Sequence, residues 1–209
     1  MIEVYGAGHL VFPRQGTIVK VDTIYGDDTG YIHVPPQNTL NITGVSNYKR
    51  INVTWAPYVY QGATLVLPNG TFEIRKAENL SYPSELVRSS HVSIWGQVVG
   101  TKAHFLVGHG ASVKFESSAP RLLQFAGISI QKTGRLELDS LQNNESDIWD
   151  MRVTKVSAPV YRDGSVTVEG GGIFVVRNLR LTADRLNLDP IGLLTANGKG
   201  FISGMILSF

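Results

Sequence analysis

The sequence predicts an all-β protein, and three observations support this fold class. β-branched residues are abundant, with 22 Val, 15 Ile and 14 Thr, whereas Ala, Glu and Lys number 11, 8 and 8. β-branched side chains keep their rotamer freedom in a strand and lose it in a helix. The 22 Gly and 9 Pro interrupt the chain at short intervals. Apolar residues alternate with period two, as in 64–67, 113–116 and 166–169, whereas helical periodicity is scarce.

A short unit of three residues recurs along the chain and predicts how the strands are arranged. In this unit, two apolar residues flank one residue of any type. A small or polar turn residue lies three positions before the start of each unit. The units begin at Val19, Leu40, Leu65, Val92, Val113, Leu136, Val166 and Leu186. Intervals of 20 to 30 residues are typical of a parallel β-solenoid, here of about eight coils, in which each coil covers the edge of the next. An antiparallel β-sandwich or jelly roll remains the alternative, since it also has short, regularly spaced strands.

The amino-acid sequences of four segments resemble the coils of right-handed parallel β-helices of the pectin-lyase-like class. They are 62–67, 110–115, 163–168 and 193–200. They also resemble β-helical segments of large eukaryotic extracellular or cell-surface proteins. The resemblance covers about residues 16–200 and implies a coil type rather than a particular activity.

Length and composition restrict the domain organisation and the partners. We expect a single solenoid domain over 1–209, with inserted loops at 43–62 and 76–91. The tail 201–209 does not continue the pattern, so it is either a capping strand or the cut edge of a longer parent chain. A net charge of +2 and the absence of cysteine argue against a nucleic-acid surface, disulfides and cysteine nucleophiles. No apolar run is long enough for a membrane span.

Five sequons for N-glycosylation predict a compartment. Asn-x-Ser/Thr occurs at Asn41, Asn52, Asn69, Asn79 and Asn144, more often than the composition gives by chance. Glycosylation of these asparagines would place the protein outside the cell or on its surface. The alternative is that these asparagines only serve turn chemistry, since Asn tolerates left-handed backbone.

No motif for catalysis, a metal or a cofactor stands out, so we assign no such residues and expect no cofactor. His104 and His109 lack neighbouring ligands that would complete a metal site. Acidic residues such as Asp147, Asp150 and Asp163 could form a pair only if the fold brought them together, with Asp184 stacked near Asp163.

The sequence therefore favours a non-catalytic extracellular structural or adhesion module, acting as a spacer or as a contact surface for a glycan or protein. The alternative is a carbohydrate-active β-helix, a polysaccharide lyase or glycoside hydrolase with paired carboxylates. The candidate contact residues are aromatic or basic: Tyr48, Trp55, Tyr58, Tyr60, Trp149, Arg177 and Arg180.

Overall fold

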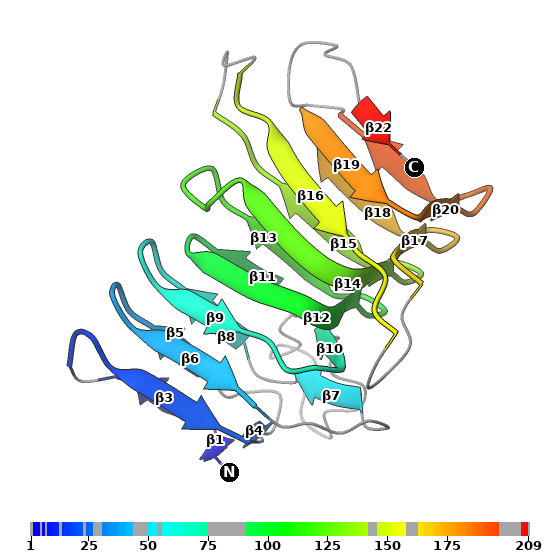
Figure 1. Ribbon diagram of the computed structural model, residues 1–209. Helices are drawn as coiled ribbons and strands as arrows, with labels where there is room; N and C mark the ends of the chain where they lie inside the picture. Colours follow the sequence, from blue (N-terminus) through cyan, green and yellow to red (C-terminus); the bar gives the residue numbers. More distant parts are fainter. Residues whose placement is uncertain are drawn as a thin grey trace.

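The computed structural model is built from parallel β-strands (Figure 1). It describes residues 2–4, 6, 8–12, 14–22, 24–26, 31–43, 50–53, 56–74, 91–141, 146–157, 163–196 and 206–208. Within these residues there is no helix, and every strand pair is parallel. The all-β solenoid is therefore confirmed, and no antiparallel hairpin of a sandwich occurs among the described pairs.

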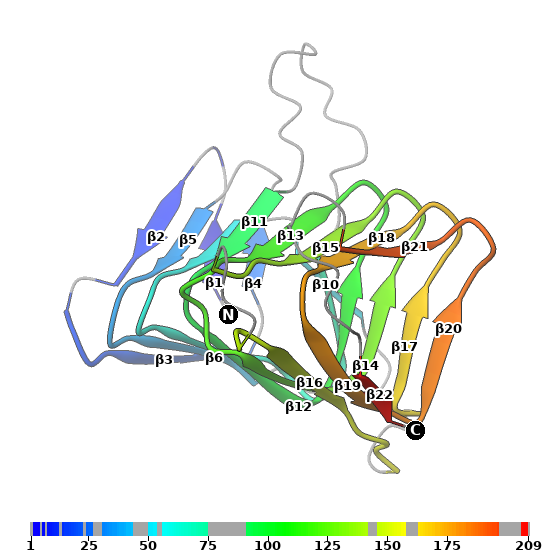
Figure 2. The ribbon, with the colours of Figure 1, turned by 90° about the horizontal axis from the view of Figure 1, so that it is seen from above.

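One sheet runs the length of the molecule and has eight strands (Figure 2). In spatial order these are β2 (His9–Val11), β5 (Tyr31–Val34), β8 (Ala56–Val59), β11 (His91–Ile94), β13 (Ser112–Phe115), β15 (Arg135–Leu138), β18 (Ile173–Val176) and β21 (Leu193–Thr195). Because they pair in parallel, each strand lies beside the strand of the next winding of the chain.

The second large sheet has twelve strands, arranged in two rows that meet at a corner. The first row is β3 (Ile18–Val21), β6 (Thr39–Ile42), β9 (Thr64–Val66), β12 (Gln97–Val107), β14 (Leu122–Ile130), β16 (Trp149–Val153), β19 (Leu179–Ala183) and β22 (Ile206–Ser208). The second row is β7 (Arg50–Val53), β10 (Thr71–Ile74), β12, β14, β17 (Ser165–Val168) and β20 (Arg185–Leu188). The strands β1 (Ile2–Val4) and β4 (Ile24–Gly26) form a separate pair.

The long strands β12 and β14 belong to both rows and turn the corner between them. The register of their pairing shifts between Gly100 and His104. The start of β12 pairs with β9, and its end pairs with β10. These two strands therefore join two faces of the solenoid in its central part.

Alternate residues of each strand point inward and stack in register to form the core. Leu40 lies opposite Leu65, and Leu65 lies opposite Val98; all three side chains are buried. On the next row, Phe72 packs against Phe105 with ring centroids 6.2 Å apart. Burying these side chains stabilises by about 1.5–3 kcal/mol each relative to exposure, so the core repeats the same contribution along the molecule.

The repeated unit of the sequence turns out to occupy three different faces. The first three units lie on β3, β6 and β9, the next three on β11, β13 and β15, and the last two on β17 and β20. Within a face, the units stack in register, as Val113 does on Leu136. The two longest intervals, from Leu65 to Val92 and from Leu136 to Val166, are the points where the pattern passes to another face.

Turn residues before these units adopt left-handed backbone in several coils. Gly62 has φ of 78° and Gly110 has φ of 69°. Gln37 and Thr133 occupy the same turn position with φ of 65° and 60° although neither is glycine. These two positions carry strain that glycine would not.

The expected inserted loop at 43–62 is corrected in part, because it contains the strands β7 and β8. The strand β8 pairs with β5 over Ala56–Val59, and Val59 is buried in the core. The aromatic residues and Pro57 hid this strand, since proline is rare inside a sheet. Of the second expected loop, 76–91, only His91 lies within the described residues, at the start of β11.

Candidate functional site

The outward face of the eight-stranded sheet carries aromatic rings over its N-terminal half. In β5, Ile32 and Val34 point inward and are buried, so Tyr31 and His33 point outward. The strands β2 and β8 place ring-bearing residues at neighbouring outward positions. We call this group the outer aromatic strip; it consists of His9, Tyr31, His33, Tyr58, Tyr60 and Trp95.

Neighbouring rings of the outer aromatic strip are nearly parallel. The ring centroids of His9 and Tyr31 are 4.9 Å apart with an interplanar angle of 21°. His33 and Tyr58 are 5.3 Å apart at 13°. Parallel strands about 4.8 Å apart bring ring pairs into the range of offset stacking. The strip is thus a continuous aromatic surface across neighbouring windings.

The strip ends at Trp95, whose ring lies 5.8 Å from Tyr60 at an angle of 8°. Trp95 follows β11 and its backbone N–H donates to the carbonyl of Val59, which fixes the tryptophan beside the end of β8. Its side chain is half-buried. One part of the indole is therefore supported by the sheet while another part meets solvent.

Two hydrogen bonds connect rings within the strip. His9 Nδ1 lies 3.1 Å from His33 Nε2, and His33 Nδ1 lies 3.1 Å from the Tyr60 hydroxyl. Partial burial, followed by the charge of His9, lowers the pKa of His33 below its ordinary value. The folded protein therefore favours a neutral imidazole at His33.

Beyond Trp95 the same sheet face becomes charged. Lys114 is in β13, and its Nζ lies 2.6 Å from Glu116, just after that strand, and 3.2 Å from Asp139. On β15, Arg135 pairs with Glu137 at 2.7 Å. Because these charges pair with one another, they form a polar border to the aromatic strip.

Tyr58 and Tyr60, two of the aromatic contacts expected from the sequence, lie in the strip. Tyr48 and Trp55 lie outside the described residues. Sequence reasoning missed His9, Tyr31, His33 and Trp95. The spacing of outward positions could have revealed them, since His9 and Tyr31 are in register. That spacing can be recognised only once the register of the coils is known.

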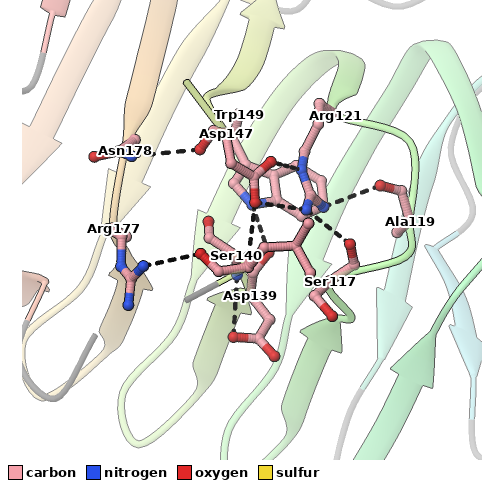
Figure 3. Close-up of polar contacts among 10 residues, drawn as sticks. Ser117, Ala119, Arg121, Asp139, Ser140, Asp147, Trp149, Arg177 and Asn178 are labelled. Atoms are coloured by element: carbon pink, nitrogen blue, oxygen red, sulfur yellow. Dashed lines mark hydrogen bonds and ion pairs between the residues drawn. The ribbon is translucent and has the colours of Figure 1, made fainter. Parts of the chain in front are cut away.

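Trp149 is not a surface contact, which corrects the expectation from the sequence (Figure 3). In β16 it occupies an inward position opposite Leu179 and is completely buried. Its Nε1–H donates to the carbonyl of Asp139 at 2.9 Å, and the Arg121 guanidinium lies 4.6 Å from its ring centroid. No ring face is left for a ligand.

The carboxylate of Asp147 is held beside Trp149 by Arg121 (Figure 3). Arg121 donates to both carboxylate oxygens, with Nη2 2.8 Å from Oδ2. It also donates to the carbonyls of Ser117 and Ala119, while Leu141 donates its backbone N–H to Asp147. These bonds connect two chain segments, so we interpret the cluster as structural.

The basic candidates have different positions. Arg177 is buried and its Nη1 donates to the carbonyl of Leu141 at 2.9 Å (Figure 3). Its role as a surface contact is therefore corrected, because the side chain is buried and its guanidinium is bonded to the backbone at Leu141. Arg180 is exposed on β19, in register with Asp150 of β16, and lies on a different face from the aromatic strip.

Three of the four acidic candidates each have a different partner. Asp147 is buried against Arg121, and Asp150 pairs with Arg152 at 2.7 Å on β16. Asp163 accepts a hydrogen bond from Ser165 at 2.7 Å, which is the main reason why its pKa is lowered. A glycosidase acid needs a raised pKa. Asp184 lies near Asp163, at the neighbouring turn, where its N–H donates to Gly164.

Two sequon side chains, those of Asn41 and Asn69, are partly exposed. Asn41 is half-buried at an outward position of β6, and Asn69 is half-buried in the bend before β10. The backbone of Asn52 is in β7. Asn79 and Asn144 lie outside the described residues.

Comparisons of the chain with family models, curated proteins and solved structures give no significant match. The parallel sheets are compatible with a β-helix, but no assignment to the pectin-lyase-like class follows. No helix among the described residues is long and apolar enough to cross a membrane. In the same part of the chain, no group of three or more His, Cys, Asp or Glu side chains could hold a metal ion.

Proposed function

We propose that this protein is a non-catalytic β-solenoid binding module that contacts saccharides through its outer aromatic strip. The supporting observation is the series of nearly parallel rings across neighbouring windings, ending at the half-buried Trp95. A pyranose ring has one face of C–H groups, which packs on aromatic rings, and a rim of hydroxyls. The Tyr hydroxyls and His nitrogens supply polar partners for that rim.

The solenoid supports this function by holding the rings on a rigid sheet. A binding surface on strands keeps its geometry better than one on loops, and aromatic residues contact a ligand with little loss of conformational entropy. A protein partner is the alternative ligand, and it would bind the same outer aromatic strip. Saccharides are favoured because the strip combines aromatic rings with Tyr hydroxyls and His ring nitrogens.

Binding of soluble oligosaccharides, first identified on a glycan array, tests this proposal by calorimetry. We expect Trp95→Ala and Tyr60→Ala each to weaken binding about tenfold, on the order of the loss of one stacked ring. The control is Leu122→Ala, which removes an exposed apolar side chain from β14, on another face. Equal affinities for the wild type and the Trp95 variant would contradict the proposal.

The proposed location is outside the cell or on its surface, supported by the five sequons. We expect protein secreted from a eukaryotic host to lose mass on treatment with an N-glycosidase. Asn41→Gln and Asn69→Gln should each remove one glycan, because both side chains are partly exposed. Asn38→Gln does not serve as a control because Asn38 is buried; Asn187→Gln does, since Asn187 is exposed and lies outside any sequon. An unchanged mass after treatment would remove this support.

Carbohydrate-active catalysis is the weaker candidate. Asp147 and Asp150 have separate basic partners, and the pKa of Asp163 is lowered rather than raised. We therefore expect Asp163→Asn to leave saccharide binding unchanged.

A further inference from the structure

The hydrogen bond between His9 and His33 limits how many protons the two rings can share. The contacting atoms, His9 Nδ1 and His33 Nε2, are 3.1 Å apart. A neutral imidazole has one N–H donor and one acceptor. With both rings neutral, donation along the series from His9 through His33 to Tyr60, or in the reverse direction, satisfies both contacts.

One added proton also fits this arrangement. A protonated His33 donates from Nδ1 to the Tyr60 hydroxyl and from Nε2 to the lone pair of His9 Nδ1. A second proton does not fit, because both contacting nitrogens would then carry hydrogens. Two unit charges at this separation also repel, more strongly in a partly buried site than in water. The two rings can therefore take up one added proton while this contact is kept, but not two.

Few groups oppose this effect. Among the residues that the structure describes, the titratable side chains packed against the two imidazoles are the phenols of Tyr31, Tyr58 and Tyr60. Among the described residues, no carboxylate or further cation is hydrogen-bonded or ion-paired to either ring. Within the part of the chain that the structure describes, a second positive charge on this pair is thus not compensated.

We propose that double protonation of His9 and His33 separates these two rings and switches off ligand binding by the outer aromatic strip at acidic pH. This regulation rests on the proposed function. Separation removes His9 from its stack on Tyr31 and frees His33 from its fixed position between His9 and Tyr60. Burial, followed by the charge of His9, also lowers the pKa of His33, in the direction that a disfavoured second protonation requires.

Two measurements on the whole chain test the proposal. NMR titration of the histidine ring carbons follows each imidazole between about pH 7.5 and about pH 4.5. Calorimetry measures the affinity for the best saccharide from the array over the same range. We expect His9 and His33 to titrate in two coupled steps and the wild-type affinity to fall about tenfold at the acidic end, on the order expected for adjacent like charges.

The His9→Phe variant keeps a ring at this position but removes one titrating group, so its affinity should be nearly independent of pH. His9→Gln serves as a second variant if the larger ring perturbs the fold. The control is His91→Phe: His91 is exposed on the same sheet, and this variant should keep the wild-type pH dependence.

The outcomes separate this proposal from the proposed function. If no saccharide binds at any pH, the proposed function and its regulation fail, and two-step titration would support only the separation of the rings. If saccharide binds with the same affinity across the range, or if the His9 variant loses affinity on acidification as the wild type does, the switch is overturned.

Discussion

At the residue scale, the buried carboxylate of Asp147 is paired with Arg121, its one partner of opposite charge among the described residues. Arg121 contacts both of its oxygens and also lies over the ring of Trp149. The side chain of Asp147 is only 7% exposed, so water cannot replace the guanidinium. Inward polar groups of this kind stabilise the protein only while both members are present.

We expect Arg121→Met to lower the free energy of unfolding by about 3–5 kcal/mol, because it leaves a buried carboxylate unpaired. The double variant Arg121→Met with Asp147→Asn should lose less, since no uncompensated charge remains. Urea denaturation followed by far-UV circular dichroism measures both. A double variant less stable than the single variant would contradict this interpretation of the pair.

At the element scale, the turns before the strands show how the solenoid accepts residues other than glycine. Gln37 and Thr133 both have positive φ, but only the side chain of Thr133 has a described hydrogen bond there. Its Oγ1 accepts the N–H of Gly110 from the neighbouring turn at 3.0 Å. Strain at Thr133 is therefore offset by a bond between coils.

We expect Gln37→Gly to raise the free energy of unfolding by about 0.5–1 kcal/mol, because relief of left-handed strain exceeds the added entropy of the unfolded chain. Thr133→Gly is the matched comparison. It relieves similar strain but loses a hydrogen bond worth about 1 kcal/mol, so it should give no gain. Equal gains for the two variants in urea denaturation would contradict the role of the Thr133 hydroxyl.

The strands themselves were largely predictable, but their assignment to faces was not. The alternating segments 64–67, 113–116 and 166–169 overlap the strands β9, β13 and β17. All three faces use the same alternation of inward apolar residues, so the unit at Val92 looks like the unit at Leu65 although they lie on different sheets. The aromatic strip was only partly predictable for the same reason, since outward neighbours are known only from the register.

At the scale of the whole molecule, each winding is protected by the windings on its two sides. The central strands β12 and β14 have neighbours on both sides, whereas β20 and β21 each pair with one strand among those described. At that end Leu188, Ile191 and Leu193 are 49%, 74% and 45% exposed. The stability of the molecule is therefore expected to vary along its length.

Hydrogen exchange measured by mass spectrometry tests this expectation. Amide protons of β12 and β14 should exchange most slowly, and those of β2, β3, β20 and β21 should exchange faster. This order follows because end windings can open without disrupting the centre. Equal protection of central and end strands would indicate a single cooperative unit instead.

The in-register stacking of Val92, Val113, Leu136 and Phe174 has an evolutionary consequence. Each member lies in register with the one before and the one after, so a gene segment encoding one full winding could be duplicated or deleted while the stacking continues. Homologous chains would then differ in length by whole windings, on the order of twenty to forty residues each. The reach of the aromatic surface would change in the same steps.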